Sequence, residues 1–286
     1  MTVHSLSQLQ FRIEEACAPE AGQGLPPDAG TLVEQLLIYL ERGEARAAER
    51  GNDGKWRAVP WVKQGILLAF RVGKVVPMPE GVSSSFSFFD KNTLPARRLA
   101  LSDGVRVVPG GSTIRSGSYL APGVVCMPPM YINVGVHIGT GTMIDSHALV
   151  GSCAQVGERV HISAAAQIGG VLEPVNAAPV VIENDAIVGG NCGVYEGTVV
   201  RERAVLAAGV VLTRGTPVFD LVRQVVHRAT DGAPLEIPAG AVVVPGARAV
   251  RDPWGAEQGL SLQTPVIVKY RDERTDLATA LEAWLR

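Results

Sequence analysis

A branched aliphatic residue at every sixth position is the feature that most limits how this chain can fold. Within residues 141–170 the spacing occurs five times in succession, at Ile144, Val150, Val156, Ile162 and Ile168. An α-helix repeats its face every 3.6 residues and a β-strand every two, so neither explains this period. The period extends back to Val108. After a shift of two it continues from Ile182 to Val218, and it occurs once more at Val244 and Val250.

The residues around each aliphatic anchor complete a six-residue unit. The residue two positions earlier is small or aliphatic, as at Ala148 and Ala154, and the residue after the anchor is often Gly, Asn, Asp or Ser. Such a unit describes one short strand and one corner, and three units close a triangular coil. Coils stacked at the strand spacing of about 4.8 Å bury their anchors in one column. The sequence therefore predicts a mainly β protein, a parallel β-helix of hexapeptide repeats, which hexapeptide families wind left-handed.

The first hundred residues lack this period and predict a small, mainly helical N-terminal domain, residues 1–104. A helix is expected with Thr31 as its N-cap and Glu34 completing a capping box. Its apolar face carries Leu32, Leu36, Leu37 and Leu40. A second helix is expected from about Trp61, and residues 75–92 are expected to form a loop.

The predicted β-helix spans residues 105–252 and the predicted C-terminal extension spans residues 253–286. The hexad is interrupted near 169–179 and near 219–236, where we expect loop insertions that form walls of a site. The extension predicts one strand and then a short helix from about Asp276.

Composition excludes several classes of function. The formal net charge is −2, so no basic field would attract nucleic acid. The four cysteines have no C-x-x-C spacing, which argues against a disulfide framework or a structural zinc site. No apolar stretch approaches the roughly 20 residues needed to span a bilayer, and the N-terminus has acidic residues where a signal peptide would be apolar. We expect a cytoplasmic protein with no membrane partner.

A β-helix alone does not specify a reaction. Zinc-dependent hydration would need histidines that converge on one ion. His137, His147 and His161 are never 18 residues apart, so they do not stack on one face, and no metal is expected. Cys153 directly precedes an inward position, and we interpret it as structural and not as a nucleophile.

Several segments resemble one family closely. They are "GTMIDSHALVGSCAQVGERVHIS", "IGGVLEP", "VIENDAIVGGN", "VYEGTVV" and "AVVVPG". They resemble the tetrahydrodipicolinate N-succinyltransferases of the succinylase route to diaminopimelate and lysine. The resemblance runs from about Val105 to Lys269, and more loosely into the N-terminal domain. "VPGGST" and "MPPMYIN" are each one residue longer than in more familiar members.

The resemblance implies an acyltransferase that moves succinyl from succinyl-CoA to the amino group of tetrahydrodipicolinate, giving N-succinyl-2-amino-6-oxopimelate and CoA. It implies a homotrimer with active sites between subunits. By motif position, Asp145 contacts the amino substrate, Glu196 is the general base and Arg106 binds a substrate carboxylate. The 51 residues between Asp145 and Glu196 amount to nearly three coils, about 14 Å along the axis. Two subunits would therefore have to bring them together.

Succinyl-CoA is the only expected cofactor-like group, and it would bind as a co-substrate in a groove between adjacent prisms. Backbone or hydroxyl contacts are expected from Ser163, Gly169, Gly170 and Ala208, and contacts with the CoA phosphates from Arg214 or Lys269. Two alternatives stay open from the sequence. One is an enzyme that uses acetyl-CoA with the same acceptor, and the other is a trimeric hexapeptide scaffold without activity.

Overall fold

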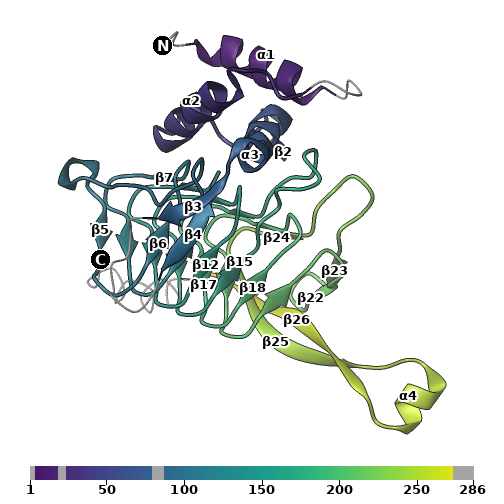
Figure 1. Ribbon diagram of the computed structural model, residues 1–286. Helices are drawn as coiled ribbons and strands as arrows, with labels where there is room; N and C mark the ends of the chain where they lie inside the picture. The colour runs from purple at the N-terminus through teal and green to yellow at the C-terminus, as the bar shows by residue number, and fades with distance from the viewer. Residues whose placement is uncertain (1–3, 19–23, 79–86, 273–286) are drawn as a thin grey trace.

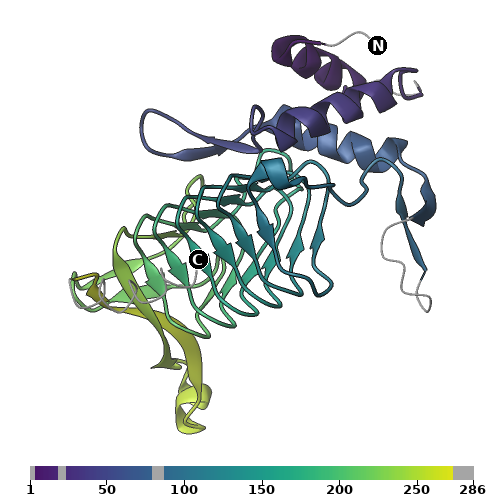
Figure 2. The same cartoon turned by 90° about the vertical axis from the view of Figure 1, so that its left-hand side faces the viewer.

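The computed structural model describes residues 4–18, 24–78 and 87–272. Figures 1 and 2 show a three-sided prism, a helical domain lying across one side of it, and an arm that projects from its far end. The three sides are sheets of six, ten and six strands, and from β5 to β21 the strands three apart along the chain are neighbours in each sheet. The predicted mainly β fold of stacked hexapeptide coils is therefore confirmed.

The coils visit the three faces of the prism in a fixed order. Face 1 contains β7 (Tyr119–Leu120), β10 (His137–Ile138), β13 (Gln155–Val156), β16 (Val181–Ile182), β19 (Val199–Val200) and β24 (Glu236–Ile237). Face 2 contains β5 (Arg106–Val107), β8 (Val125–Cys126), β11 (Met143–Ile144), β14 (His161–Ile162), β17 (Ile187–Val188), β20 (Val205–Leu206), β25 (Ala241–Ala249), β26 (Ser261–Tyr270), β22 (Val218–Asp220) and β23 (Val225–His227). Face 3 contains β6 (Thr113–Ile114), β9 (Tyr131–Ile132), β12 (Leu149–Val150), β15 (Gln167–Ile168), β18 (Gly193–Val194) and β21 (Val211–Leu212).

The hexad anchors form the core of the prism. On face 2, Ile144 pairs with Ile162, which pairs with Val188, and all three side chains are fully buried. Burial of such a side chain is worth about 1.5–3 kcal/mol relative to exposure, so the repeated column supplies most of the driving force for this fold. Glycines that follow an anchor serve the stacking: a Cβ on Gly139 would lie 2.6 Å from the backbone of Gly157 in the next coil.

The predicted last anchors, Val244 and Val250, are wrong. Both side chains are only partly buried, and the fully buried residues of the last coil are Ile237 and Val243. Val243 takes the anchor position because it pairs with the anchor Leu206. The long second insertion changes the register by one residue, and a spacing counted across it in the sequence cannot reveal that change.

The N-terminal domain contains α1 (Leu6–Cys17), α2 (Ala29–Glu41), α3 (Pro60–Val72) and two antiparallel hairpins, β1 (Ala48–Arg50) with β2 (Trp56–Ala58) and β3 (Val75–Met78) with β4 (Phe88–Lys91). A 3₁₀ turn at Leu101–Asp103 leads into the prism. The predicted α2 capping box is wrong, because the helix begins after Asp28 and Thr31 lies inside its first turn. The prediction of a loop at 75–92 is partly wrong, because β3 and β4 pair there as antiparallel strands. Each strand has four residues, too few for its alternation of apolar and polar residues to be distinguished from a loop in the sequence.

The N-terminal domain packs on face 1 of the prism. Its core includes Leu36 and Ile66, and it continues into the prism through Val134 and Cys153. The Arg46 Nε atom donates a hydrogen bond to Gln155 Oε1 at 3.0 Å. Burial raises the pKa of the Cys153 thiol to about 12, as expected for a structural cysteine. The two regions therefore share one continuous apolar contact.

Beyond the last coil, β25 and β26 leave face 2 as a long antiparallel arm with the short helix α4 (Pro253–Glu257) near its tip (Figures 1 and 2). The strand expected in the C-terminal extension is β26. The helix expected from about Asp276 lies outside the described residues.

Candidate active site

The predicted site residues gather mainly on two edges of the prism. The chain passes from face 2 to face 3 at the edge that carries Asp145, called here the Asp145 edge, and this edge also carries Ser163 and Ala208. It passes from face 3 to face 1 at the edge that carries Glu196, called the Glu196 edge. The Glu196 edge also carries Gly169, Gly170 and Arg214. Arg106 and Lys269 lie on face 2, in β5 and β26.

Both insertions leave the prism from the Glu196 edge. The first, 169–179, connects β15 to β16, and the second lies between β21 and β24. The corner with Glu196 connects β18 to β19, and its coil lies between the coils that carry the two insertions. Glu196 therefore lies on a strip of regular coil with a protruding segment on each side.

A groove of about 1140 Å³ lies at this position. Its floor includes Tyr195 and Glu196, and its walls include Ala177 of the first insertion and Ala233 of the second. The N-terminal domain closes it with Trp56, Arg57 and Ala58 of β2. Four predicted site residues line this groove: Gly169, Gly170, Glu196 and Arg214.

The corner at Glu196 differs from the regular corners. At most corners a single residue three positions after the anchor is left-handed, such as Ala165 at φ 57°. Here two consecutive residues are left-handed, Glu196 at φ 54° and Gly197 at φ 73°. A left-handed non-glycine residue is unfavourable by about 1–2 kcal/mol, and such conformations cluster at functional sites. The exposed carboxylate of Glu196 accepts a 2.8 Å hydrogen bond from the backbone N–H of Arg214.

Tyr195 explains the glycines beneath it. A Cβ on Gly169 would lie 2.7 Å from the Tyr195 ring, and a Cβ on Gly193 would lie 2.5 Å from it. The backbone N–H of Gly169 donates to Val194 O at 2.8 Å, so this N–H is engaged in coil stacking. Gly169 thus shapes the floor of the groove by making room for the aromatic ring, whereas Gly170 is exposed.

At the Asp145 edge the carboxylate is partly buried. Asp145 Oδ1 accepts a 2.7 Å bond from the Ser146 N–H, and Oδ2 lies 3.9 Å from His161 Nε2. Ser163 follows the stacked anchor one coil later, and its N–H donates to Val188 O at 2.9 Å. Ala208 is exposed on the same edge. These residues form a continuous edge, separated from the groove by the width of face 3.

Asp145 and Glu196 are therefore apart within one chain. Eight of the 51 positions that separate them come from the first insertion, because the anchors Ile168 and Ile182 are 14 positions apart instead of 6. The true rise is between two and three coils, about 11 Å along the axis, and the two residues project from different edges. Arg106 is four strands from the level of Glu196 on another face, about 19 Å along the axis. Lys269 pairs with Val242 on face 2 and forms a 3.5 Å ion pair with Asp272.

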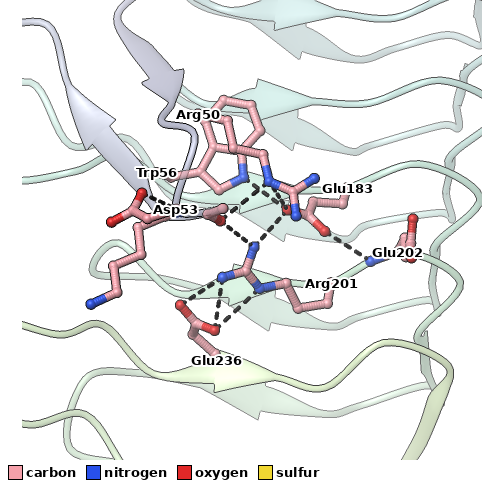
Figure 3. Close-up of polar contacts among 9 residues, drawn as sticks. Arg50, Asp53, Trp56, Glu183, Arg201, Glu202 and Glu236 are labelled. Atoms are coloured by element: carbon pink, nitrogen blue, oxygen red, sulfur yellow. Dashed lines mark hydrogen bonds and ion pairs between the residues drawn. The ribbon is translucent and has the colours of Figure 1, made fainter.

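A network of charged side chains fixes the β1–β2 hairpin beside the groove (Figure 3). Trp56 Nε1 donates to the buried Glu183 carboxylate at 2.9 Å, and Arg201 donates to the same carboxylate at 2.8 Å. Arg201 also holds Glu236, at the end of the second insertion, through both carboxylate oxygens, and donates to Gly54 O at the hairpin tip. Burial opposes the charge of Arg201, but its bonds to Glu236 and Glu183 raise the pKa of the guanidinium overall.

The three histidines considered for a metal lie apart. His137 is on face 1, His161 is on face 2, and His147 is in a corner of the Asp145 edge. Burial lowers the pKa of His137 to about 3. Within the described part of the chain, no cluster of three or more His, Cys, Asp or Glu residues has the geometry to hold a metal ion.

Sequence reasoning missed Tyr195, Trp56 and Arg57 as groove residues. Tyr195 had a usable signal, since it directly precedes Glu196 in "VYEGTVV". Trp56 and Arg57 had none, because they lie in another domain and reach the groove only through the docking of the β1–β2 hairpin.

Comparison with known proteins agrees with this architecture. Residues 8–72 match the family model "Tetrahydrodipicolinate N-succinyltransferase N-terminal", and residues 179–214 match "Hexapeptide repeat of succinyl-transferase". The chain is 41% identical over 292 residues to the 2,3,4,5-tetrahydropyridine-2,6-dicarboxylate N-succinyltransferase of Brucella ovis, with 100% of both chains covered. It is 40% identical to the Nitrobacter winogradskyi protein of the same name, covering 96% of this chain and 95% of the relative. The chain belongs to this N-succinyltransferase family.

Membership of the N-succinyltransferase family confirms the family that the sequence motifs indicated and the predicted acyltransferase class. The relatives' names describe an enzyme, and not the inactive scaffold that the sequence left open. A solved structure of a Campylobacter jejuni protein, described as a 2,3,4,5-tetrahydropyridine-2-carboxylate N-succinyltransferase, has the same kind of fold. Its TM-score is 0.50 at 15% identity, and the match covers 82% of this chain and 62% of that one. Among the described residues of this family member, no helix has the length and hydrophobicity to span a bilayer.

Proposed function

We propose that this N-succinyltransferase transfers succinyl from succinyl-CoA to the amino group derived from tetrahydrodipicolinate, with Glu196 as general base. The observation that carries the proposal is the position of Glu196. It projects from a doubly left-handed corner into a groove of about 1140 Å³ between the two insertions. This departure from regular coil geometry coincides with the carboxylate that the family motif singles out.

The chemistry requires a base at this place. An amine attacks a thioester only in its unprotonated form, so a carboxylate beside the amine can accept the proton as the C–N bond forms and CoA leaves. The Arg214 N–H bond keeps one oxygen of Glu196 fixed and leaves the other oxygen for the substrate. No covalent acyl-enzyme is needed, and the buried Cys153, whose pKa is raised to about 12, is unsuited to form one.

The acceptor carries two carboxylates and needs donors that the groove of one chain does not supply in full. Asp145 and Arg106 lie on other surfaces of the same prism. We place them in the site of a neighbouring copy, with Asp145 on the amino group and Arg106 on a carboxylate. A closed homotrimer, in which the Asp145 edge of one prism faces the Glu196 edge of the next, satisfies this requirement.

CoA would follow the same interface. Gly170 and Arg214 line the groove, whereas Ser163, Ala208 and Lys269 lie on the other edge or on face 2. We therefore divide the predicted CoA contacts between two copies, with Arg214 toward the phosphates on the groove side and Lys269 toward them on the partner side. A cytoplasmic location remains our proposal, in keeping with the use of succinyl-CoA.

Replacement of Glu196 tests the proposal most directly. Glu196→Gln keeps the size and one acceptor oxygen but removes the base, so we expect turnover to fall by about 10²–10⁴-fold. Thiol release from succinyl-CoA measures it, and size-exclusion chromatography checks the assembly. Glu202→Gln is the matched control, because Glu202 also sits two residues after an anchor, is exposed and lies outside the groove. Wild-type turnover by Glu196→Gln would remove Glu196 as the base.

The acyl donor needs its own measurement. Steady-state assays with succinyl-CoA and acetyl-CoA at equal acceptor concentration compare the two kcat/KM values. We expect a preference for succinyl-CoA, because Arg57 lines the groove and can bind the additional carboxylate in exchange for its exposed partner Asp53. Equal kcat/KM values would favour the acetyl-CoA alternative.

A further inference from the structure

Lys63 is a buried cation with a specific pair of partners. It lies in α3 of the N-terminal domain and its side chain is fully buried. The Nζ atom donates to the carbonyl oxygens of Pro174 at 2.9 Å and Ala177 at 2.8 Å. Both carbonyls belong to the first insertion. Within the described residues, no carboxylate oxygen lies within 4 Å of this ammonium group.

Burial of such a group is unfavourable unless its hydrogen bonds compensate. Desolvation lowers the pKa of Lys63, as expected for an ammonium group removed from water without a carboxylate partner. The prism does not need this bond for its own stacking, since the coils above and below the insertion are joined by the β15–β18 and β16–β19 pairs. What the bond fixes is the path of residues 174–177, of which Pro174, Asn176 and Ala177 line the groove.

The clamped segment continues directly to the corner with Glu196. Ala178 follows the clamp, and its carbonyl oxygen lies 2.7 Å from the place that a Cβ on Gly197 would take. The insertion therefore rests against the second of the two left-handed residues. A shift of the insertion would change the support of this corner and the orientation of the neighbouring carboxylate.

We propose that Lys63 is a positioning residue for catalysis, which holds the first insertion against the corner with Glu196 through the carbonyls of Pro174 and Ala177. The inference rests on the proposed function, because it assigns Lys63 a role in the geometry of the proposed base. It also gives the helical domain a task in the reaction, since α3 supplies the clamp.

Lys63→Met tests the clamp, because it keeps the apolar stem and removes every donor. We expect kcat for succinyl transfer to fall by about 10–100-fold with a smaller change in KM, since an error of about 1 Å in catalytic geometry has an effect of this size. Hydrogen exchange at Ala177, whose N–H donates to Pro174 O at 3.0 Å, should become faster. Lys63→Arg keeps the charge and the donors, so it should fold and regain part of both losses.

Leu68→Ala is the matched control, because Leu68 is fully buried in the same helix and belongs to the helical core. It should lower the melting temperature while kcat and the exchange at Ala177 stay at wild-type values. If Lys63→Met and Lys63→Arg both keep wild-type kcat, or if Leu68→Ala lowers kcat as much as Lys63→Met, the positioning role is wrong.

A double variant separates this inference from the function beneath it. If Lys63 acts through Glu196, then Lys63→Met combined with Glu196→Gln should be no slower than Glu196→Gln alone. Multiplied losses would contradict the coupling. A fully active Glu196→Gln would contradict the proposed base, whereas an inactive Glu196→Gln beside a fully active Lys63→Met would contradict only the clamp.

Discussion

The Asp145 edge and the Glu196 edge are built around the same buried core, yet only the Glu196 edge releases long insertions. Most corners on the Asp145 edge have one left-handed residue three positions after the anchor, such as His147 and Ala165. The β5–β6 corner is one residue longer, and the β8–β9 corner, which contains Pro128 and Pro129, has no left-handed residue. The Glu196 edge releases both insertions and carries two consecutive left-handed residues between them. A regular edge presents side chains in a line, whereas an interrupted edge builds walls.

The comparison shows how a repetitive fold acquires a site. The anchors are buried on all three faces, so their spacing tolerates little change. Corner residues face outward, and an insertion there adds chain without disturbing the column. Walls can therefore form at an edge at little expense in stability. A flat edge such as the Asp145 edge can complete such a groove only when another copy brings it near.

Complementation between inactive variants is the largest effect that would test this division of labour. Asp145→Asn and Glu196→Gln should each lose turnover by about 10²-fold or more. Proteins unfolded together and refolded as mixed oligomers should recover activity, because roughly a quarter of the shared sites in a random mixture would hold both native carboxylates. Thiol release from succinyl-CoA, measured before and after mixing, gives the result.

The control is each variant refolded alone, which should stay inactive. If the mixture also stays inactive while oligomers containing both variants are detected by mass spectrometry, Asp145 and Glu196 do not act together across copies, and the shared site is wrong.

Glycine replacements on the two edges sharpen the comparison at a smaller scale. A Cβ on Gly189 of the Asp145 edge would lie 2.6 Å from the backbone oxygen of Leu206, which cannot move without breaking the stack. A Cβ on Gly169 of the Glu196 edge would lie 2.7 Å from the ring of Tyr195 and no closer than 3.2 Å to any backbone atom. We expect Gly189→Ala to lower the free energy of unfolding by about 1–3 kcal/mol and Gly169→Ala by less.

Activity should show the reverse order. Gly169→Ala displaces the aromatic floor of the groove and should lower kcat/KM more than Gly189→Ala, whose added Cβ reaches only the backbone beside Ala208. Urea denaturation and thiol-release assays on both variants measure the two quantities. Equal losses of activity would mean that the interrupted edge is no more sensitive than the regular one.

The smallest expected effect concerns a left-handed corner without a role in the site. Ala165 on the Asp145 edge has φ 57°, a conformation that glycine adopts without strain. Ala165→Gly should raise the free energy of unfolding by up to about 1 kcal/mol, because the relief of strain exceeds the added entropy of the unfolded chain. Urea denaturation at constant pH measures this change, and turnover should not change. A lower free energy of unfolding would show that the left-handed backbone of Ala165 is not strained in the coil.

Part of this structure was predictable from the sequence, for particular reasons. The anchor spacing predicted the buried column because inward positions of stacked coils must be apolar and evenly spaced. It failed at Val108, because Val107 is the residue that pairs with the anchor Cys126. It also failed at Val244 and Val250, since a register change inside the second insertion leaves no mark in the spacing. The apolar face of α2 was predicted, but its start was not, because Thr31 with Glu34 resembles a capping box although the helix begins after Asp28.

The candidate site was predictable only as a set of residues. Glu196 came from the family motif and Arg214 from the need for a cation near the CoA phosphates, and they lie in one groove. Ser163, Ala208 and Lys269 were assigned to the same ligand, yet the structure places them on other surfaces. Position in the hexad predicts whether a residue faces outward, but the edge on which it lies depends on counting coils through each insertion.

The sequence by itself determined that this chain stacks short strands into a three-sided prism and that the stack is interrupted twice, because the burial of one residue in six is a local pattern that repeats. Only the tertiary structure decided that both interruptions open on the same edge, that Trp56 and Lys63 reach them from the helical domain, and that Asp145 faces elsewhere. Such contacts join residues about a hundred positions apart, and their geometry depends on how whole domains dock, which no local period records.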